Sequence, residues 1–211
     1  MDSDILGTAL DLKNVSLKAR YYSTPYLRNY FESIREQDIT YKYDEIVVYH
    51  KSIPTDESII RLNNIIGGNT PQYLFAGIIE SKALVGHSEF SSTCFKHHNV
   101  VEFDLTLNGT SCNGFPLTSH DSSPINVYEK YLETTGRKFQ NLCAGLIEPS
   151  DFVKFHYIYS HKFNVESNDG WLGINLKLSQ VFKENMVLVI WTVYDVEMKV
   201  DRFKRIEKSI I

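Results

Sequence analysis

The sequence predicts an all-β protein, namely an antiparallel sandwich with two short helices in the connections. Three observations favour this fold class. Apolar and polar residues alternate with a period of two over several segments, as in strands with one buried and one solvent-exposed face. Aromatic residues, which are enriched in strands, make up 13% of the chain. Asn-Gly and Asp-Gly pairs, the usual residues of tight hairpin turns, lie next to the alternating segments.

Each alternating or apolar segment predicts one strand. The predicted strands cover residues 15–20, 45–49, 59–65, 73–80, 101–108, 153–159, 172–178 and 186–201. The apolar positions of these segments give the expected core: Val15, Leu17, Phe103, Leu105, Phe155, Tyr157, Ile174, Leu176, Val189, Trp191 and Val196.

Two helices are predicted between the strands. The first begins at Ser23-Thr24-Pro25, a capping residue followed by proline at the start of a helix. The second begins at Ser123-Pro124 and ends before Gly136. The glycines at 67–68, 109, 114 and 170 are interpreted as turn residues that need positive φ, not as a phosphate-binding loop. Since no repeat, low-complexity segment or linker interrupts the chain, residues 1–211 are expected to form a single domain.

Composition and charge exclude several classes of protein. The chain has 22 Lys and Arg against 26 Asp and Glu, a net charge of −4, which argues against a strongly basic nucleic-acid binder. At 43% hydrophobic residues, it is not a disordered polyanion. Its acidic start lacks the features of a signal peptide, and its longest apolar run, at 186–193, is too short to cross a bilayer. We therefore expect a protein made in the interior of a cell and not secreted.

The histidines and cysteines form no recognisable site. His97 and His98 are adjacent, and His156 and His161 are five residues apart, so on strands each pair would point to opposite faces. The other histidines, namely His50, His87 and His120, are isolated. No metal site and no cofactor are predicted. The three cysteines, at 94, 112 and 143, form no C-x-x-C pair and are expected to be free thiols.

No catalytic motif is present either. There is no G-x-S-x-G or H-E-x-x-H sequence, and His120-Asp121-Ser122 is interpreted as a polar loop because triad residues come from separate elements. A dyad of Cys94 or Cys143 with a histidine has no local sequence signal in its favour. Basic and aromatic residues alternate at 20–22 and 154–157, but with this net charge we interpret the aromatic residues as core. No catalytic, cofactor-binding or metal-binding residue is therefore assigned, specific nucleic-acid binding is not expected, and the protein is predicted not to be an enzyme.

A series of short motifs in a fixed order carries a resemblance to a known family. In chain order they are Cys94–Val100, Leu107-Asn108-Gly109, Phe115-Pro116-Leu117, the helix from Tyr128 to Gly136, residues 147–152 with the aromatic segment 155–163, Gly173–Leu178 with Phe182, and residues 187–194 with Val200-Asp201-Arg202. From Tyr73 onward the sequence resembles the C-terminal half of the hexon-type, double-jelly-roll major capsid protein of Polinton/Maverick elements and adintovirus-like viruses. Upstream, the order of strand, helix and strand is fainter but similar.

The resemblance implies a single jelly-roll domain and a structural role in a virion. Its partners would be copies of itself or another jelly-roll capsid subunit, contacted through loops such as 109–124 and 164–170. The sequence departs from the family at His98, where the family has tyrosine, at Cys112 and Asn113 in the hairpin region, and in lacking the first jelly roll. We therefore expect a fragment or split product of a capsid gene, or a domesticated single-roll descendant.

Two other classes of function remain open on the sequence, because a jelly-roll fold alone does not determine function. The first is a soluble ligand- or carbohydrate-binding β-sandwich. An exposed aromatic cluster beside a shallow polar pocket would support it. The second is a cupin-like metalloenzyme, which would need histidines and a carboxylate converging inside a barrel.

Overall fold

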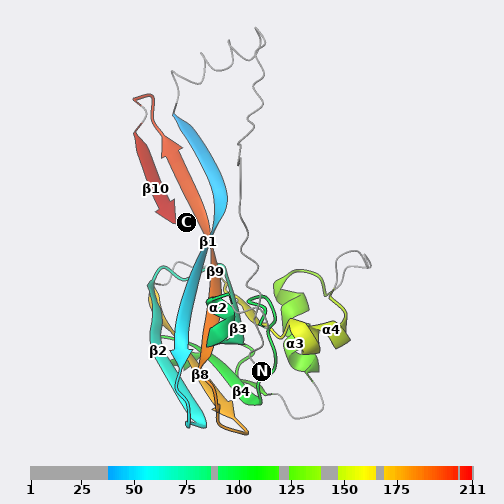
Figure 1. Cartoon of the computed structure of the whole chain (residues 1–211). Coiled ribbons are helices and arrows are strands. Elements are labelled where there is room, and N and C mark those ends of the chain that lie inside the picture. The colour runs from blue at the N-terminus through cyan, green and yellow to red at the C-terminus, as the bar shows by residue number, and fades with distance from the viewer. Residues whose placement is uncertain are drawn as a thin grey trace, which may run out of the picture. The chain divides into compact units, whose positions relative to one another are not determined.

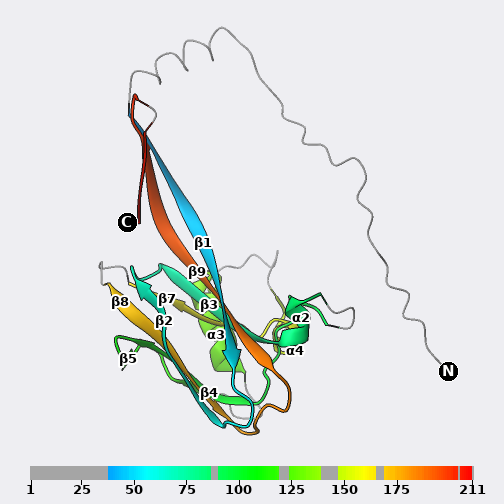
Figure 2. The ribbon, with the colours of Figure 1, turned by 60° about the vertical axis from the view of Figure 1, so that its left-hand side comes forward.

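The computed structural model describes residues 38–86, 90–118, 124–138, 147–164, 169–203 and 205–210. The predicted strand at 15–20, the helix that begins at Ser23, and the core positions Val15 and Leu17 lie outside these residues. The described strands form two antiparallel sheets, and the predicted all-β jelly-roll sandwich is confirmed. Figure 1 and Figure 2 show the two sheets facing each other.

The first sheet contains the longest strands of the protein. Its order is β1 (Ile39–Ile53), β9 (Met186–Val200), β3 (Tyr73–Glu80) and β7 (Tyr159–Lys162), and β10 (Ile206–Ile210) also pairs with β9. Strand β9 pairs with β3 from Met186 to Val193. The predicted strand at 186–201 thus became the middle strand of a sheet, which explains its continuous apolar start.

The second sheet has shorter strands and includes the hairpin turn predicted at Asn108-Gly109. Its order is β2 (Ile59–Gly68), β8 (Gly170–Leu178), β4 (Val100–Leu107) and β5 (Thr110–Ser111), with β6 (Leu117–Thr118) paired to β4. The Asn108-Gly109 turn links β4 and β5, and both residues have positive φ (53° and 79°), as a type I′ hairpin requires. The turn predicted there is confirmed.

The core lies between the two sheets. Inward side chains of both sheets form one large hydrophobic cluster, in which the Phe103 ring stacks on Tyr159 with 4.0 Å between centroids. Seven of the predicted core residues are buried: Phe103, Leu105, Tyr157, Ile174, Leu176, Val189 and Val196. Trp191 is only partly buried, against a second, smaller cluster.

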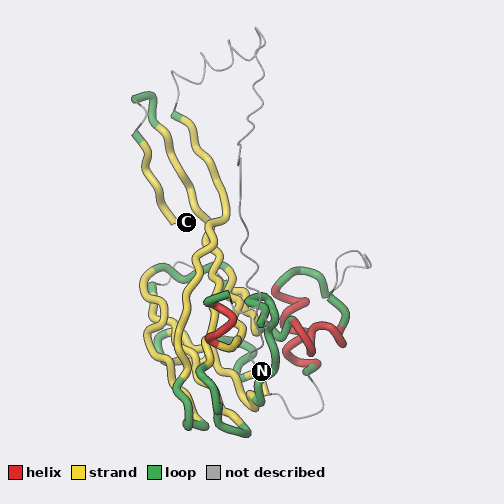
Figure 3. The backbone as a smooth tube through the Cα atoms, viewed as in Figure 1, coloured by secondary structure: helices red, strands yellow, loops and turns green. Residues whose placement is uncertain are grey.

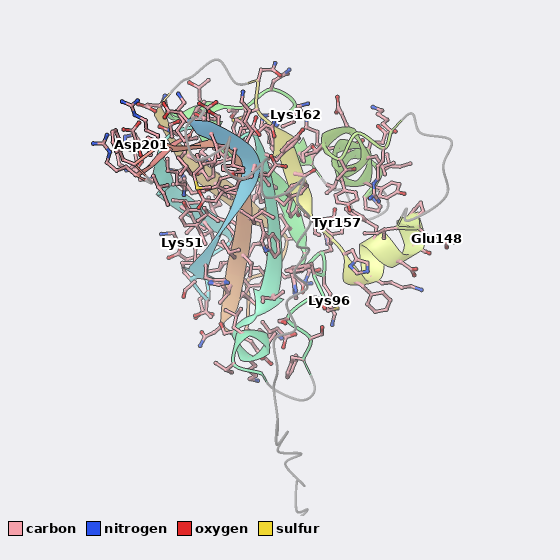
Figure 4. All side chains as sticks on the ribbon, turned by 90° about the horizontal axis from the view of Figure 1, so that it is seen from above. Lys51, Lys96, Glu148, Tyr157, Lys162 and Asp201 are labelled. Atoms are coloured by element: carbon pink, nitrogen blue, oxygen red, sulfur yellow. The ribbon has the colours of Figure 1, made fainter. Side chains whose placement is uncertain are left out.

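Helices cover part of the core beside β7. Helix α3 (Ile125–Thr134) begins after Pro124 and is followed by Gly136 with φ of 70°, as predicted. It packs on β7 and on α4 (Pro149–Phe155), and Figure 3 shows the two helices together on one side of the strands. In Figure 4, Tyr157 lies between the strands and α4, whose preceding residue Glu148 is labelled. A third, four-residue helix, α2 (Ser81–Leu84), follows β3.

The predicted strand at 153–159 is wrong. Its first half belongs to α4, and strand β7 begins only at Tyr159. Pro149 in the first turn and Asp151 near the positive helix N-terminus start a helix, and these local signals override the short alternation that follows. As a result Phe152 is buried, whereas Phe155, predicted to be core, is 47% exposed.

The chain divides into two compact units. Residues 40–199 and 206–211 form the larger unit, which contains both sheets and the three helices described above. The described part of the smaller unit comprises Asp38, Ile39 and the turn that follows β9. The single domain expected for residues 1–211 stays a prediction.

Gly77 in β3 gives a test of the smaller cluster. A Cβ at this position would lie 2.4 Å from Cδ1 of Phe95, which is buried and contacts Trp191 edge-on at 5.1 Å. We expect Gly77→Ala to lower the free energy of unfolding by about 1–3 kcal/mol through overpacking, measured by urea denaturation. A Gly77→Ala/Phe95→Leu double variant should lose less stability than the sum of the losses of the two single variants, because the smaller leucine leaves room for the added methyl group. Strict additivity of the two single effects would contradict the contact.

Candidate functional site

The most unusual surface of the larger unit is the extension of its first sheet. Past Val193, β9 no longer pairs with β3 and is flanked by β1 and β10. We call residues 40–45, residues 194–199 and β10 the ribbon, and Figure 1 shows its three strands side by side. Just before the ribbon, the Thr192 hydroxyl donates a hydrogen bond to the Val47 carbonyl oxygen. This contact ties β1 to β9 where the two leave the sandwich.

One face of the ribbon is charged. Lys42 and Lys199 both contact Glu197, with N–O distances of 3.7 and 3.1 Å. The hydrogen bond from Lys199 lowers the pKa of the Glu197 carboxyl below its ordinary value. Because side chains alternate along a strand, the even positions of β1 and the odd positions of β9 share this face. It is a typical solvated sheet surface.

The opposite face of the ribbon is apolar. One ion pair also lies on this face and shows which positions of β1 and β10 share it. The Lys208 ammonium contacts the Glu45 carboxylate at an N–O distance of 2.7 Å, and this hydrogen bond raises the pKa of Lys208. By alternation, Tyr41 and Tyr43 of β1 and Ile206 and Ile210 of β10 lie on the same face as this ion pair. All four side chains are exposed, Tyr41 by 48% and Ile206 by 66%.

No second sheet of the described residues packs on this part of β1 and β10. A sheet with one apolar face normally buries that face against another layer. The middle strand does contribute buried residues here, Tyr194 and Val196. The apolar side chains of the two outer strands remain exposed on this face, and exposed apolar side chains gathered on one face are typical of interaction sites.

The smaller unit contains a short basic cluster after β9, with the sequence Arg202-Phe203-Lys204-Arg205. The Asp201 carboxylate accepts hydrogen bonds from the backbone N–H groups of Phe203 and Arg205 and pairs with the Arg205 guanidinium at 2.6 Å. The Arg202 and Arg205 guanidinium groups lie 4.9 and 5.3 Å from the centre of the Phe203 ring. The described residues of this cluster therefore present two guanidinium groups and one aromatic ring.

The cysteines described in the structure are free thiols, as expected, while Cys143 lies outside the described residues. Burial and the nearby Asp104 raise the pKa of the Cys112 thiol to about 11, against a smaller opposing effect of Lys130. Cys112 thus stays protonated at neutral pH and is a poor nucleophile.

Cys94 and His98 line the same hollow, of about 160 Å³, beside α2. Burial, with a smaller contribution from Lys96, lowers the pKa of His98 to about 4, so its imidazole is neutral at pH 7. Within the described residues, however, no hydrogen bond joins the thiol to the imidazole. The structure brings these two side chains into one hollow without forming the dyad geometry that activates a thiol.

The histidines that the structure describes do not converge with other possible metal ligands. In the part of the chain that the structure describes, no three His, Cys, Asp or Glu side chains are grouped so that they could hold a metal ion. His161 is buried between Phe115 and Phe163, with ring-centre distances of 5.3 and 4.6 Å.

In the described residues, no helix is long and apolar enough to cross a membrane.

Comparison with known proteins gives matches in structure only. No protein-family model matches the sequence, and no curated protein does. A chain of the Sputnik virophage, from a 3.5 Å cryo-EM structure, is similar over 82% of this chain, with 13% identity and a TM-score of 0.47. The crystal structure of the mavirus major capsid protein is similar over 82%, with 5% identity and a TM-score of 0.46. This chain spans 39% and 42% of those two chains, less than half of each.

Proposed function

We propose that this protein is a structural capsid subunit of a DNA virus or a virus-derived element, and that it acts by assembly rather than by catalysis. In this proposal the subunit is part of a virion, after synthesis inside the host cell. Its partners are copies of itself or another jelly-roll capsid subunit.

The apolar face of the ribbon carries the proposal. Tyr41, Tyr43, Ile206 and Ile210 expose apolar surface on the part of the sheet that extends past β3. Aromatic and aliphatic side chains of this kind form the buried centre of protein interfaces. A neighbouring subunit laid against the ribbon would bury them and supply the missing second layer. The charges of the Glu45–Lys208 pair on the same face would favour one orientation of the neighbouring subunit.

Two further properties support a structural role. The sandwich core is closely packed and contains large rings that touch, such as Phe103 and Tyr159, which makes the subunit a rigid block. The order of motifs from Tyr73 onward resembles that of a double-jelly-roll major capsid protein. With a single jelly roll, six copies, or partners with a second roll, would be needed for a pseudo-hexagonal unit.

A face-specific double variant tests the proposal. Tyr41→Ser/Ile206→Ser removes apolar surface from the proposed contact. We expect the wild-type chain to form oligomers, and the variant to dissociate at a concentration at least ~10-fold higher. Size-exclusion chromatography with light scattering over a concentration series gives this value, and negative-stain electron microscopy shows whether rings or shells form.

Lys42→Ser/Glu207→Ser is the matched control, because it changes the same two strands on their charged face. Exposed substitutions should leave the thermal unfolding of both variants close to that of the wild type. A wild-type chain that is monomeric at every concentration would contradict self-assembly. An equal shift for both variants would contradict the choice of face.

A further inference from the structure

A second surface, on the outer side of the shorter sheet, has the features of a ligand site. A hollow of about 490 Å³ lies where β2 and β8 meet the β4–β5 turn. The residues that line it are Asn63, Asn64, Thr106, Asn108, Gly109, Trp171 and Gly173. All of them belong to the larger unit, and none is ionisable. The hollow therefore combines one large aromatic ring with amide and hydroxyl groups.

Trp171 provides a positioned aromatic surface. It pairs across the sheet with Gly67, and its ring lies over that glycine: a Cβ on Gly67 would be 2.2 Å from Cζ3 of the indole. The Trp171 backbone N–H also donates a 2.9 Å hydrogen bond to the Asn108 side-chain oxygen. The ring is thus set against backbone on one side, yet the side chain is 57% exposed. A large ring held in this way needs no reordering to stack on a ligand.

A bulge in β2 supplies the polar groups. The register of β2 on β8 shifts between Leu62 and Ile66, and Asn64 in this stretch has φ of 51°. Bulges turn side chains away from the regular alternation and occur next to binding sites. Here two successive residues, Asn63 and Asn64, are exposed on the hollow. Among the described residues, neither amide group has a hydrogen-bond partner, so each can donate to and accept from a ligand.

Glycine and threonine form the floor. Gly173 lies opposite Thr106 on β4, and a Cβ on Gly173 would be 2.8 Å from the threonine hydroxyl. The absence of a side chain at 173 leaves this hydroxyl accessible from the hollow. Recognition of phosphate or carboxylate groups usually relies on Arg or Lys, and neither lines the hollow. The lining therefore favours an uncharged ligand with many hydroxyl groups.

We propose that the hollow around Trp171 binds a neutral saccharide. A pyranose ring has an apolar C–H face that can stack on the indole, while its rim carries hydroxyls that both donate and accept hydrogen bonds. Asn63, Asn64 and Thr106 provide matching groups around the ring. This site is separate from the ribbon, because it lies on the other sheet, and its use does not depend on the proposed assembly.

A glycan array of neutral, sialylated and sulfated oligosaccharides, probed with the full chain, identifies candidates. Lactose, maltose, cellobiose and chitobiose are then titrated in solution along with the neutral array hits. Trp171 and Trp191 are the only two tryptophans, so the Trp191→Phe variant makes indole fluorescence a reporter of Trp171 alone. We expect at least one neutral saccharide to change this fluorescence saturably. Isothermal titration calorimetry on the unmutated chain gives the reference Kd.

Three variants test the geometry. Trp171→Ala should weaken binding at least ~10-fold, as loss of a central aromatic contact does, whereas Trp171→Phe should keep part of it. Gly67→Ala should also weaken binding, because the added methyl group displaces the ring. Phe203→Ala, which removes an exposed ring of the smaller unit, is the control and should bind like the wild type. Circular dichroism of each variant confirms folding.

Several results would overturn the proposal. They are the absence of binding to any neutral saccharide, unchanged binding by Trp171→Ala, and binding confined to sialylated or sulfated glycans. A change of oligomeric state in Trp171→Ala without any saccharide binding would also overturn it, since the face would then be a contact between proteins.

Discussion

Replacing Phe103 with alanine is expected to lower the free energy of unfolding by about 3–5 kcal/mol, the usual range for a buried aromatic residue. The Phe103 side chain is buried on β4, stacks on Tyr159 at 4.0 Å and lies 6.1 Å from the Phe115 ring. It thus joins the two sheets, because Tyr159 belongs to β7 of the other sheet. Urea denaturation followed by circular dichroism measures the loss.

Phe203→Ala is the matched control for this substitution, since Phe203 is 64% exposed. It should change stability by no more than about 0.5 kcal/mol. A loss below about 1 kcal/mol for Phe103→Ala would mean that the stacked pair does not hold the sheets together.

Acid is expected to destabilise the protein through His161. Burial, with a smaller contribution from Lys130 and an opposing one from Glu133, lowers the pKa of this histidine from 6.5 to about 4. The unfolded chain therefore binds a proton between pH 6.5 and 4 that the folded chain does not bind. The contribution of His161 to the free energy of unfolding is fully present above pH 6.5. It decreases as the pH drops towards 4, by about 2–3 kcal/mol.

His161→Gln separates this effect from other acid-sensitive groups. The slope of stability against pH between 6.5 and 4 should become shallower in this variant, even if its stability at pH 7 is reduced. His50→Gln, which makes the same substitution at an exposed position, is the control for the replacement itself. Denaturant unfolding at a series of pH values gives both slopes. Identical slopes for wild type and His161→Gln would show that His161 does not titrate as described.

Long, regular patterns predicted their elements well. The alternation at 101–108 and 172–178 became the adjacent strands β4 and β8, and the apolar run at 186–191 became the part of β9 that pairs with β3. In a protein of two packed sheets, the alternation shows which side chains face the core. Each residue of a long alternating segment therefore supports the same strand assignment. The Asn108-Gly109 turn was equally clear, because its backbone conformation depends on those two residues alone.

Short patterns were less reliable. The five alternating residues at 153–157 are compatible with a strand or with the end of a helix, and most of them became helix because Pro149 had already started it. The burial of Phe152 against Tyr128 and Tyr131 of α3 stabilises this choice, with ring distances of 5.1 and 5.4 Å. Those contacts join residues about twenty positions apart, which a local pattern does not record.

Neither the apolar face of the ribbon nor the hollow around Trp171 could be predicted from the sequence. Residues 45–49 were predicted as a strand, but nothing in the sequence showed that β1 continues from Ile39 beside the far half of β9 with an uncovered apolar face. No sequence pattern indicated that Trp171 and Asn63 belong to one site. They are 108 positions apart in the chain and meet only through the pairing of β2 with β8 and the bulge between Leu62 and Ile66.

The sequence by itself determined the β-sandwich class, the long strands of its core at 101–108, 172–178 and 186–201, and the position of its hairpin turn, because each of these depends on neighbouring residues and on the period of the pleat. Only the tertiary structure decided which side chains remain exposed together. Exposure depends on where a covering layer ends, as at Val193, where β9 leaves β3 and continues between β1 and β10. That boundary is set by the lengths of strands far apart in the chain.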